Sequence, residues 1–156
     1  LPPVDDRVYF KAMQALYGPD GADAIGRAYR SGLLGEGHDA KALLDIGRKI
    51  ARSYWQAYET GPIRCTLADK NFGGAVAIDH KAAKEREQAL EANLKCVQAL
   101  GQPTRRAFDQ LVIDVNPDHG PAWLDRLCWQ TQKQLDIHPA DLAQLALAIE
   151  GLQACK

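Results

Sequence analysis

The chain has 156 residues, of which 46% are hydrophobic and 25% are charged, and its formal net charge is −1. This composition is typical of a folded globular protein and argues against disorder as the main state. A nearly neutral chain is a poor candidate for coating a polyanion with its whole surface, although it can still carry a local basic patch. The length fits one domain, and we expect a single helical domain over residues 1–156.

No apolar run of the sequence approaches the roughly 18 residues that a membrane-spanning helix requires. No signal peptide is recognisable, so we expect a cytoplasmic protein with no membrane partner. The chain begins at Leu1, which leaves open whether a preceding segment was removed. The four cysteines form no CxxC pair and have apolar neighbours, which favours buried thiols over a metal site; one or two disulfides remain an alternative for an exported chain.

Apolar periodicity and turn residues predict an all-α fold, a compact domain of six or seven helices. The predicted helices cover residues 5–17, 22–31, 40–58, 79–100, 105–115, 121–135 and 138–152. Asp39 and Thr104 are the predicted caps of two of them. One irregular loop is expected near residues 61–78, with a short strand at 76–78, and its glycines make it a candidate functional segment.

The predicted helix at residues 40–58 has two distinct faces. Its apolar side carries Leu43, Ile46, Gly47, Ile50, Tyr54 and Trp55, and its other side carries Lys41, Arg48, Lys49 and Arg52 with Asp45 among them. Such a helix can present cations to an anionic partner, or it can be an ordinary amphipathic surface helix. The aromatic residues near its end, including Tyr58, can stack on bases or pack in a core, and for Trp55 we favour the core.

A short local similarity links two of the predicted helices. Ile25-Gly26-Arg27 and Ile46-Gly47-Arg48 share one pattern, and each is followed by a serine. A glycine on an apolar helix face allows a second helix to approach closely. We therefore expect close helix packing at both glycines, with both arginines in solvent.

The basic residues are the main candidates for a binding site. Arg105 and Arg106 fall in the first turn of their predicted helix, where they can contact phosphate together with free backbone N–H groups. The proposed phosphate-contacting set consists of Arg27, Arg30, Arg48, Lys49, Arg52, Arg105 and Arg106. The alternative is that these residues are dispersed, solubilising charges.

The sequence contains no recognisable catalytic motif. The four histidines lie at predicted turns and helix starts, so no clustered metal ligands are evident. No phosphate-binding glycine loop or nucleophile elbow is present. We therefore expect no metal and no cofactor, and the expectation leans away from an enzyme.

Two stretches, residues 23–58 and 105–129, resemble small uncharacterised helical proteins of phages, prophages and proteobacterial genomes. In these proteins a short helix ends in a turn and leads into a helix that contains Gly-Arg and ends in Tyr or Trp. The resemblance covers about half of the chain and carries no catalytic motif. It implies a bacterial or phage context, in which small helical proteins often associate with DNA as regulators or packaging components.

The leading hypothesis is a non-enzymatic, nucleic-acid-associated regulatory factor that contacts the phosphate backbone through a basic helical face. The alternative is a protein–protein interaction module, such as an adaptor, an inhibitor of a host enzyme or a self-assembling homo-oligomer. Its hallmark would be an exposed apolar patch, for example around Trp129 or Phe72. A third hypothesis places a small-molecule or catalytic site in residues 65–74.

Overall fold

The computed structural model describes residues 15–59, 80–114 and 120–156. Within these ranges the chain is helical and contains no strand, so the predicted all-α class is confirmed. The elements are the 3-10 helix η1 (Gly18–Ala22), α2 (Ala24–Arg30), α3 (Gly37–Glu59), α5 (His80–Ala99), α6 (Gln102–Phe108), the π-helix η2 (Asp109–Ile113), α7 (Ala122–Gln132) and α8 (Pro139–Gln153). The predicted loop at 61–78 and its strand lie outside the described residues, as does most of the predicted helix at 5–17.

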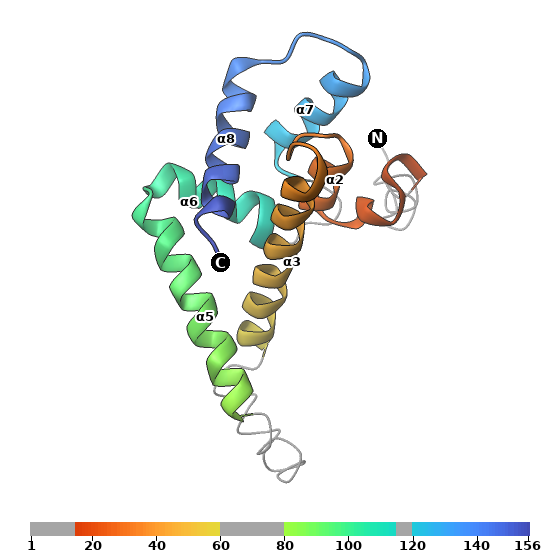
Figure 1. The fold of residues 1–156 in the computed structure, drawn as a ribbon. Helices are drawn as coiled ribbons and strands as arrows, with labels where there is room; N and C mark the ends of the chain where they lie inside the picture. Colours follow the sequence, from red (N-terminus) through yellow and green to blue (C-terminus); the bar gives the residue numbers. More distant parts are fainter. Residues whose placement is uncertain (1–14, 60–79, 115–119) are drawn as a thin grey trace, which may run out of the picture.

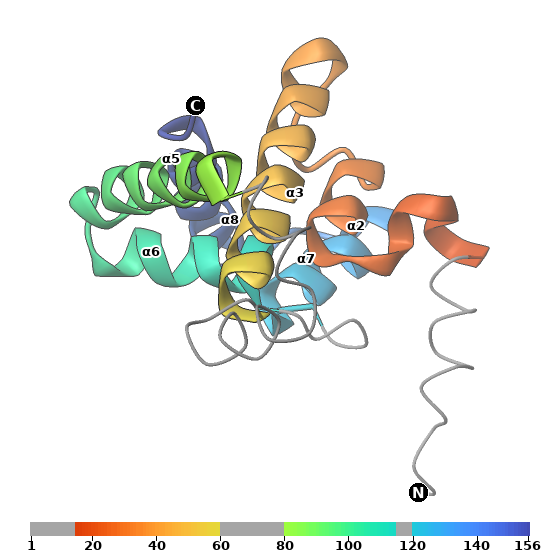
Figure 2. The same cartoon turned by 90° about the horizontal axis from the view of Figure 1, so that it is seen from below.

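Helix α3 runs through the middle of the fold. Figure 1 and Figure 2 show α5, α6 and α8 on one side of it and α2 and α7 on the other. Helices α3 and α5 approach each other at their lower ends in Figure 1 and diverge upwards, and α6 continues through η2 back towards α3. Helix α3, helix α5 and the α6–η2 segment therefore border one side of the molecule.

The core is centred on the packing of α6 against α8, which is the most extensive helix contact in the fold. Phe108 of α6 is fully buried there, together with Leu152 of α8 and Val97 of α5. A Cβ atom at Gly151 would lie 3.1 Å from Phe108 Cδ2 and 3.3 Å from Val97 Cγ1. Glycine at this position therefore lets the end of α8 lie directly against both α5 and α6.

The two Ile-Gly-Arg segments meet each other where α2 packs on α3. A Cβ atom on Gly47 would collide with Ile25 Cδ1, and one on Gly26 would collide with the backbone of Asp20 and the side chain of Asp23. The Gly26 site also lies only 2.7 Å from the guanidinium of Arg48. The prediction of close packing at both glycines is thus confirmed, but the contact at Gly26 is polar.

Several predicted helix starts are wrong by a few residues. Helix α3 begins at Gly37, so Asp39 lies inside its first turn and is not the cap. Helix α6 begins at Gln102, after an N-cap at Gly101 with a φ of 117°, so Thr104 is a buried helical residue. Pro103 does not delay the helix, because proline is tolerated in a first turn. Arg105 and Arg106 consequently lie in the last turn of α6 and not in its first.

An ion pair links α7 to the first turn of α8. Arg126 Nη2 and Nε donate to the two carboxylate oxygens of Asp141 at 2.8 and 3.0 Å, and Asp141 is only 3% exposed. The hydrogen bonds from Arg126 outweigh burial and hold the pKa of Asp141 below its usual value. Near-neutral pH therefore keeps the α7–α8 pair in its charged, bridged form.

The Arg126–Asp141 pair makes stability depend on pH in a defined direction. Because the pKa of Asp141 is lowered in the folded state, the pair stabilises the fold above its unfolded pKa of about 3.8 and loses this effect as the pH falls through the lower folded pKa. We expect Asp141→Asn to reduce the free energy of unfolding most at neutral pH. The difference between the variant and the unchanged protein should become smaller as the pH falls below about 3.8. Urea unfolding at several pH values measures this difference, with Asp136→Asn, in the exposed α7–α8 connection, as the control. A difference that does not change with pH would contradict this role for the pair.

Candidate functional site

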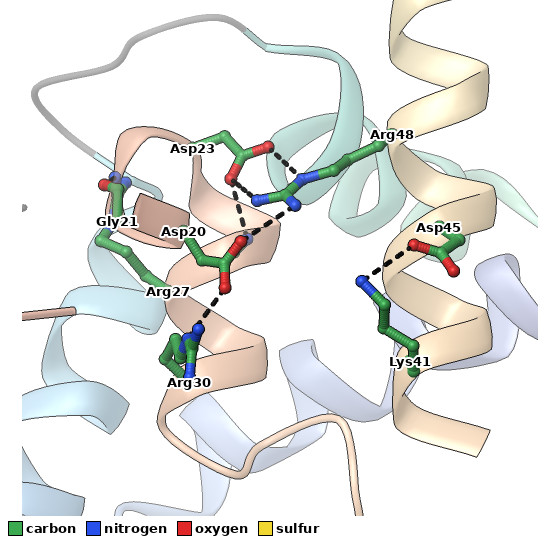
Figure 3. Close-up of polar contacts among 9 residues, drawn as sticks. Asp20, Gly21, Asp23, Arg27, Arg30, Lys41, Asp45 and Arg48 are labelled. Atoms are coloured by element: carbon green, nitrogen blue, oxygen red, sulfur yellow. Dashed lines mark hydrogen bonds and ion pairs between the residues drawn. The ribbon is translucent and has the colours of Figure 1, made fainter. Parts of the chain in front are cut away.

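Four of the seven predicted phosphate contacts make internal interactions with carboxylates or backbone. Figure 3 shows three of them, Arg27, Arg30 and Arg48, around the junction of η1, α2 and α3. Arg48 Nε and Nη2 donate to the two carboxylate oxygens of Asp23 at 3.1 and 3.0 Å, and its Nη1 donates to Asp20 Oδ1 at 3.1 Å. Arg30 Nε donates to the other oxygen of Asp20 at 2.8 Å. Arg30 and Arg48 thus share the carboxylate of Asp20, and Arg48 also forms a bidentate pair with Asp23.

The same carboxylates organise the backbone of this junction. Asp23 is the N-cap of α2, and its Oδ1 accepts a hydrogen bond from the backbone N–H of Gly26 at 3.1 Å. Burial tends to raise the pKa of Asp20, but hydrogen bonds from Arg48 and Arg30 outweigh it and leave that pKa below its usual value. The hydrogen bonds to Asp23 raise the pKa of Arg48. We name Asp20, Asp23, Arg30 and Arg48 the junction network.

Arg27 lies inside the fold. Its side chain is buried, the whole residue being 2% exposed, and its Nη1 donates to the backbone carbonyl of Gly21 at 3.0 Å. A Cβ atom at Gly120 would lie 2.7 Å from Arg27 Nη2 and 3.2 Å from Asp125 Oδ1, so the guanidinium reaches the start of α7. A ligand in solvent cannot reach a side chain in this position, and the prediction that Arg27 is solvated is wrong.

The remaining predicted cations do not form one surface. Arg105 Nε donates to Asp109 Oδ1 at 2.8 Å within the α6–η2 segment. Lys49, Arg52 and Arg106 are exposed and form no ion pair with the described part of the chain. Lys49 and Arg52 lie on the outer side of α3, whereas Arg106 lies on α6, which packs on α8 and α5. The fold thus leaves two exposed cations of the predicted set side by side.

A groove of about 520 Å³ lies between α3 and α5, with Arg105 of α6 also in its wall. Its apolar lining consists of Tyr54, Ala57, Tyr58, Leu90 and Leu94, and its polar lining of Glu87, Glu91, Lys95, Gln98 and Arg105. Leu90 is buried and Leu94 is half-buried, whereas Tyr58 is 72% exposed at the edge. We name these ten residues the α3–α5 groove.

The aromatic residues at the end of α3 have separate roles. Trp55 Nε1 donates to the backbone carbonyl of Ile113 at 2.9 Å, which fixes α3 to the end of η2. The rings of Tyr54 and Tyr58 meet Trp55 edge to face, with centroid distances of 5.4 and 5.5 Å. Trp55 is therefore a half-buried anchor that holds the two groove tyrosines in place. It does not belong to the buried core, so the core position favoured from the sequence is wrong.

A second hollow, of about 550 Å³, lies between η1 and the end of α7. Its wall includes Tyr17 and Ser31, and Ser31 Oγ donates to Cys128 Sγ at 3.4 Å. Burial, followed by the interaction with Cys128, raises the pKa of Tyr17 to about 12. Burial also raises the pKa of Cys128. Both groups therefore stay protonated at neutral pH, where neither acts as an effective base or nucleophile.

The described residues contain no cluster of three or more acidic, histidine or cysteine side chains suited to a metal ion. Among the described helices, none combines the length and apolar character needed to cross a bilayer. Comparisons with protein-family models, with curated proteins and with solved structures found no match.

Two features of the site were not foreseen from the sequence. The partner carboxylates Asp20 and Asp23 lie before α2, and only the capping tendency of Asp23 could have drawn attention to them. The groove required knowledge of which helices are neighbours. The spacing of Tyr54 and Tyr58 was visible, but it does not identify α5 as the opposite wall. Of the two places expected to show an apolar patch, Trp129 is exposed and Phe72 lies outside the described residues.

Arg48 and Arg52 lie on the same helix, but only Arg48 belongs to the junction network, so the two residues should differ in their contribution to stability. Arg48→Ala removes hydrogen bonds to both Asp20 and Asp23, so we expect the free energy of unfolding to fall by about 1–3 kcal/mol. Arg52→Ala, one turn further along the same helix, should change it by less than about 0.5 kcal/mol. Chemical denaturation followed by circular dichroism measures both variants. Equal effects of the two substitutions would show that the network does not hold α2 on α3.

Proposed function

We propose that this protein is a non-enzymatic interaction module that binds a short amphipathic helix of a partner polypeptide in the α3–α5 groove. The observation that carries the proposal is the apolar lining of the α3–α5 groove, whose two main walls are the preformed helices α3 and α5. Binding an apolar helix face in such a groove is a recurrent mode of peptide recognition. Tyr58, exposed at the edge of the groove, also supplies an aromatic side chain of the kind that is enriched in protein–protein interfaces.

The dimensions of the groove fit a helix of about three turns. The α5 residues that line it extend from Glu87 to Gln98. At about 1.5 Å per residue, this stretch is roughly 16 Å long, which corresponds to about 11 residues of a bound helix. The partner would present apolar side chains at positions i, i+3 or i+4, and i+7 to the groove.

The charges along the groove favour one orientation of the partner. Glu87 and Glu91 lie on the part of α5 nearer its start, and Lys95 follows them one turn later. Glu91 and Lys95 are 3.4 Å apart, but both side chains are largely exposed, so this pair is readily exchanged for contacts with a ligand. Arg105 lies in the wall contributed by α6. A helix with a basic residue towards Glu87 and an acidic residue towards Lys95 would complement both ends.

Nucleic-acid binding is the second candidate function. It is supported by Lys49 and Arg52, which are exposed one turn apart on α3, and a bacterial or phage regulatory role would follow from the resemblance noted above. Two neighbouring cations supply a small fraction of the phosphate contacts that DNA-binding proteins commonly make. The internal pairing of Arg30, Arg48 and Arg105 and the burial of Arg27 weaken this candidate relative to the groove.

Selection from a display library of random 12-residue peptides tests the primary proposal. We expect the selected peptides to share an apolar i, i+3/4, i+7 pattern with a basic residue near one end. Their affinity, measured by fluorescence anisotropy, should fall at least about tenfold for Tyr58→Ala, because tyrosine is enriched among the residues that contribute most to binding. Ala92→Asp places a charge on an exposed position of α5 that is not part of the groove, and it should leave the affinity unchanged.

The same proteins, assayed with random duplex DNA at low and moderate salt, separate the two candidates. Salt-dependent binding that is lost in a Lys49→Ala, Arg52→Ala double variant, with no peptide selected on the groove, would favour the nucleic-acid function. Selected peptides that bind the Tyr58→Ala variant as tightly as the unchanged protein would contradict the groove assignment. Self-association that Tyr58→Ala abolishes would identify a second copy of the chain as the occupant.

A further inference from the structure

The end of α8 lies against the side of α5. A Cβ atom at Gly151 would be only 3.3 Å from Val97 Cγ1, so the two helices touch at these positions. The three residues that follow α8 continue along the same side of α5. Asn93 accepts a hydrogen bond from the backbone N–H of Lys156 at 3.0 Å and donates one to its backbone carbonyl at 3.3 Å.

These contacts place two cysteines next to each other. On α5, Cys96 lies one turn from Asn93 on the same side of the helix, and Asn93 is hydrogen-bonded to Lys156. On the other side, Cys155 directly precedes Lys156, and its thiol donates to the Gly151 carbonyl at 3.4 Å. Burial, together with the proximity of the Cys96 thiolate, raises the pKa of Cys155 to about 11. Both thiols are free, with Cys96 exposed and Cys155 buried.

We propose that Cys96 and Cys155 form an oxidisable dithiol site, which closes to a disulfide in the presence of a low-molecular-weight disulfide such as glutathione disulfide. This site is separate from the α3–α5 groove, whose lining contains neither cysteine. The bond would join the segment after α8 covalently to α5. Disulfides typically join Cα atoms about 4.4–6.8 Å apart, a range that residues on adjoining turns can reach.

The two cysteines have different parts in the reaction. The exposed Cys96 thiolate attacks one sulfur of glutathione disulfide, which forms a mixed disulfide and releases one glutathione thiolate. Cys155 then loses its proton to water, and its thiolate attacks the Cys96 sulfur and releases the second glutathione. The protein loses two protons and two electrons, and one glutathione disulfide becomes two glutathione molecules. Because the Cys155 thiol is weakly acidic, the second step is the slower one.

Mass spectrometry of the full chain under non-reducing conditions tests this proposal. After incubation with glutathione disulfide, we expect a peptide pair joined through Cys96 and Cys155, and dithiothreitol should reverse it. The disulfide closes a long loop, so the midpoint of thermal unfolding should rise by roughly 5–10 °C. Asn93→Ala, which removes both hydrogen bonds to Lys156, should slow conversion of the mixed disulfide several-fold, because Asn93 positions the segment.

Two cysteine variants provide the controls. In Cys155→Ser the glutathione adduct should remain on Cys96 without closing, and in Cys65→Ser the cross-link should still form. Cys96→Ser replaces an exposed residue, so it should fold normally and show neither adduct nor thermal shift at this site, even if Cys155→Ser proves unstable. A glutathione adduct that persists on Cys96 in the unchanged protein, or a cross-link from Cys96 to Cys65 or to a second molecule, would overturn the assignment.

Discussion

The close contact of α2 with α3 is the constraint on which the rest of the molecule depends. Gly47 accepts the side chain of Ile25, and Gly26 makes room for the guanidinium of Arg48. A side chain at either glycine would separate the helices. Arg48 then binds Asp23, which is the cap of α2, so a single cation fixes the start of one helix to the middle of another. The two Ile-Gly-Arg segments are therefore complementary halves of one contact.

This contact determines what remains at the surface. The arginines that give α2 and α3 their basic character in the sequence mostly face carboxylates or backbone in the fold. Charge-assisted hydrogen bonds of this kind stabilise a local structure and also remove cations from the set available to a ligand. The far end of α3 has no such network. There the helix approaches α5 (Figure 1), and its tyrosines border an apolar groove. Helix α3 thus carries the junction network at its middle and one wall of the groove at its end.

The sequence was informative wherever local periodicity decides the structure. The helical class followed from the spacing of apolar residues, and Trp129, which the sequence suggested for an exposed apolar patch, is exposed. The ends of helices were less predictable: Pro103 marked a break, yet proline fits the first turn of α6. The π-helix η2 gave no signal in advance, because its bonding pattern depends on how Leu111 and Ile113 pack between neighbours.

The candidate site was harder to foresee for a physical reason. The helical face of Arg48 and Lys49 can be read from their spacing, but only tertiary contacts show that Arg48 faces two carboxylates and Lys49 does not. A single chain contains many possible acidic partners for each arginine, and Asp20 and Asp23 belong to a short segment that reads as a turn. The walls of the groove come from helices that are separated by a long stretch of chain. Long-range neighbours of this kind leave no local periodicity to detect.

Nuclear magnetic resonance of the arginine side chains tests most directly whether these charges belong to the interior of the fold. Rotation about the Nε–Cζ bond and hydrogen exchange at Nε slow down when a guanidinium is held by several acceptors. We expect slow rotation and protected exchange for Arg27 and Arg48, and fast averaging for Arg52 and Arg106. If Arg48 rotates and exchanges as freely as Arg52, the junction network does not persist in solution, and the basic face of α3 is available to a ligand after all.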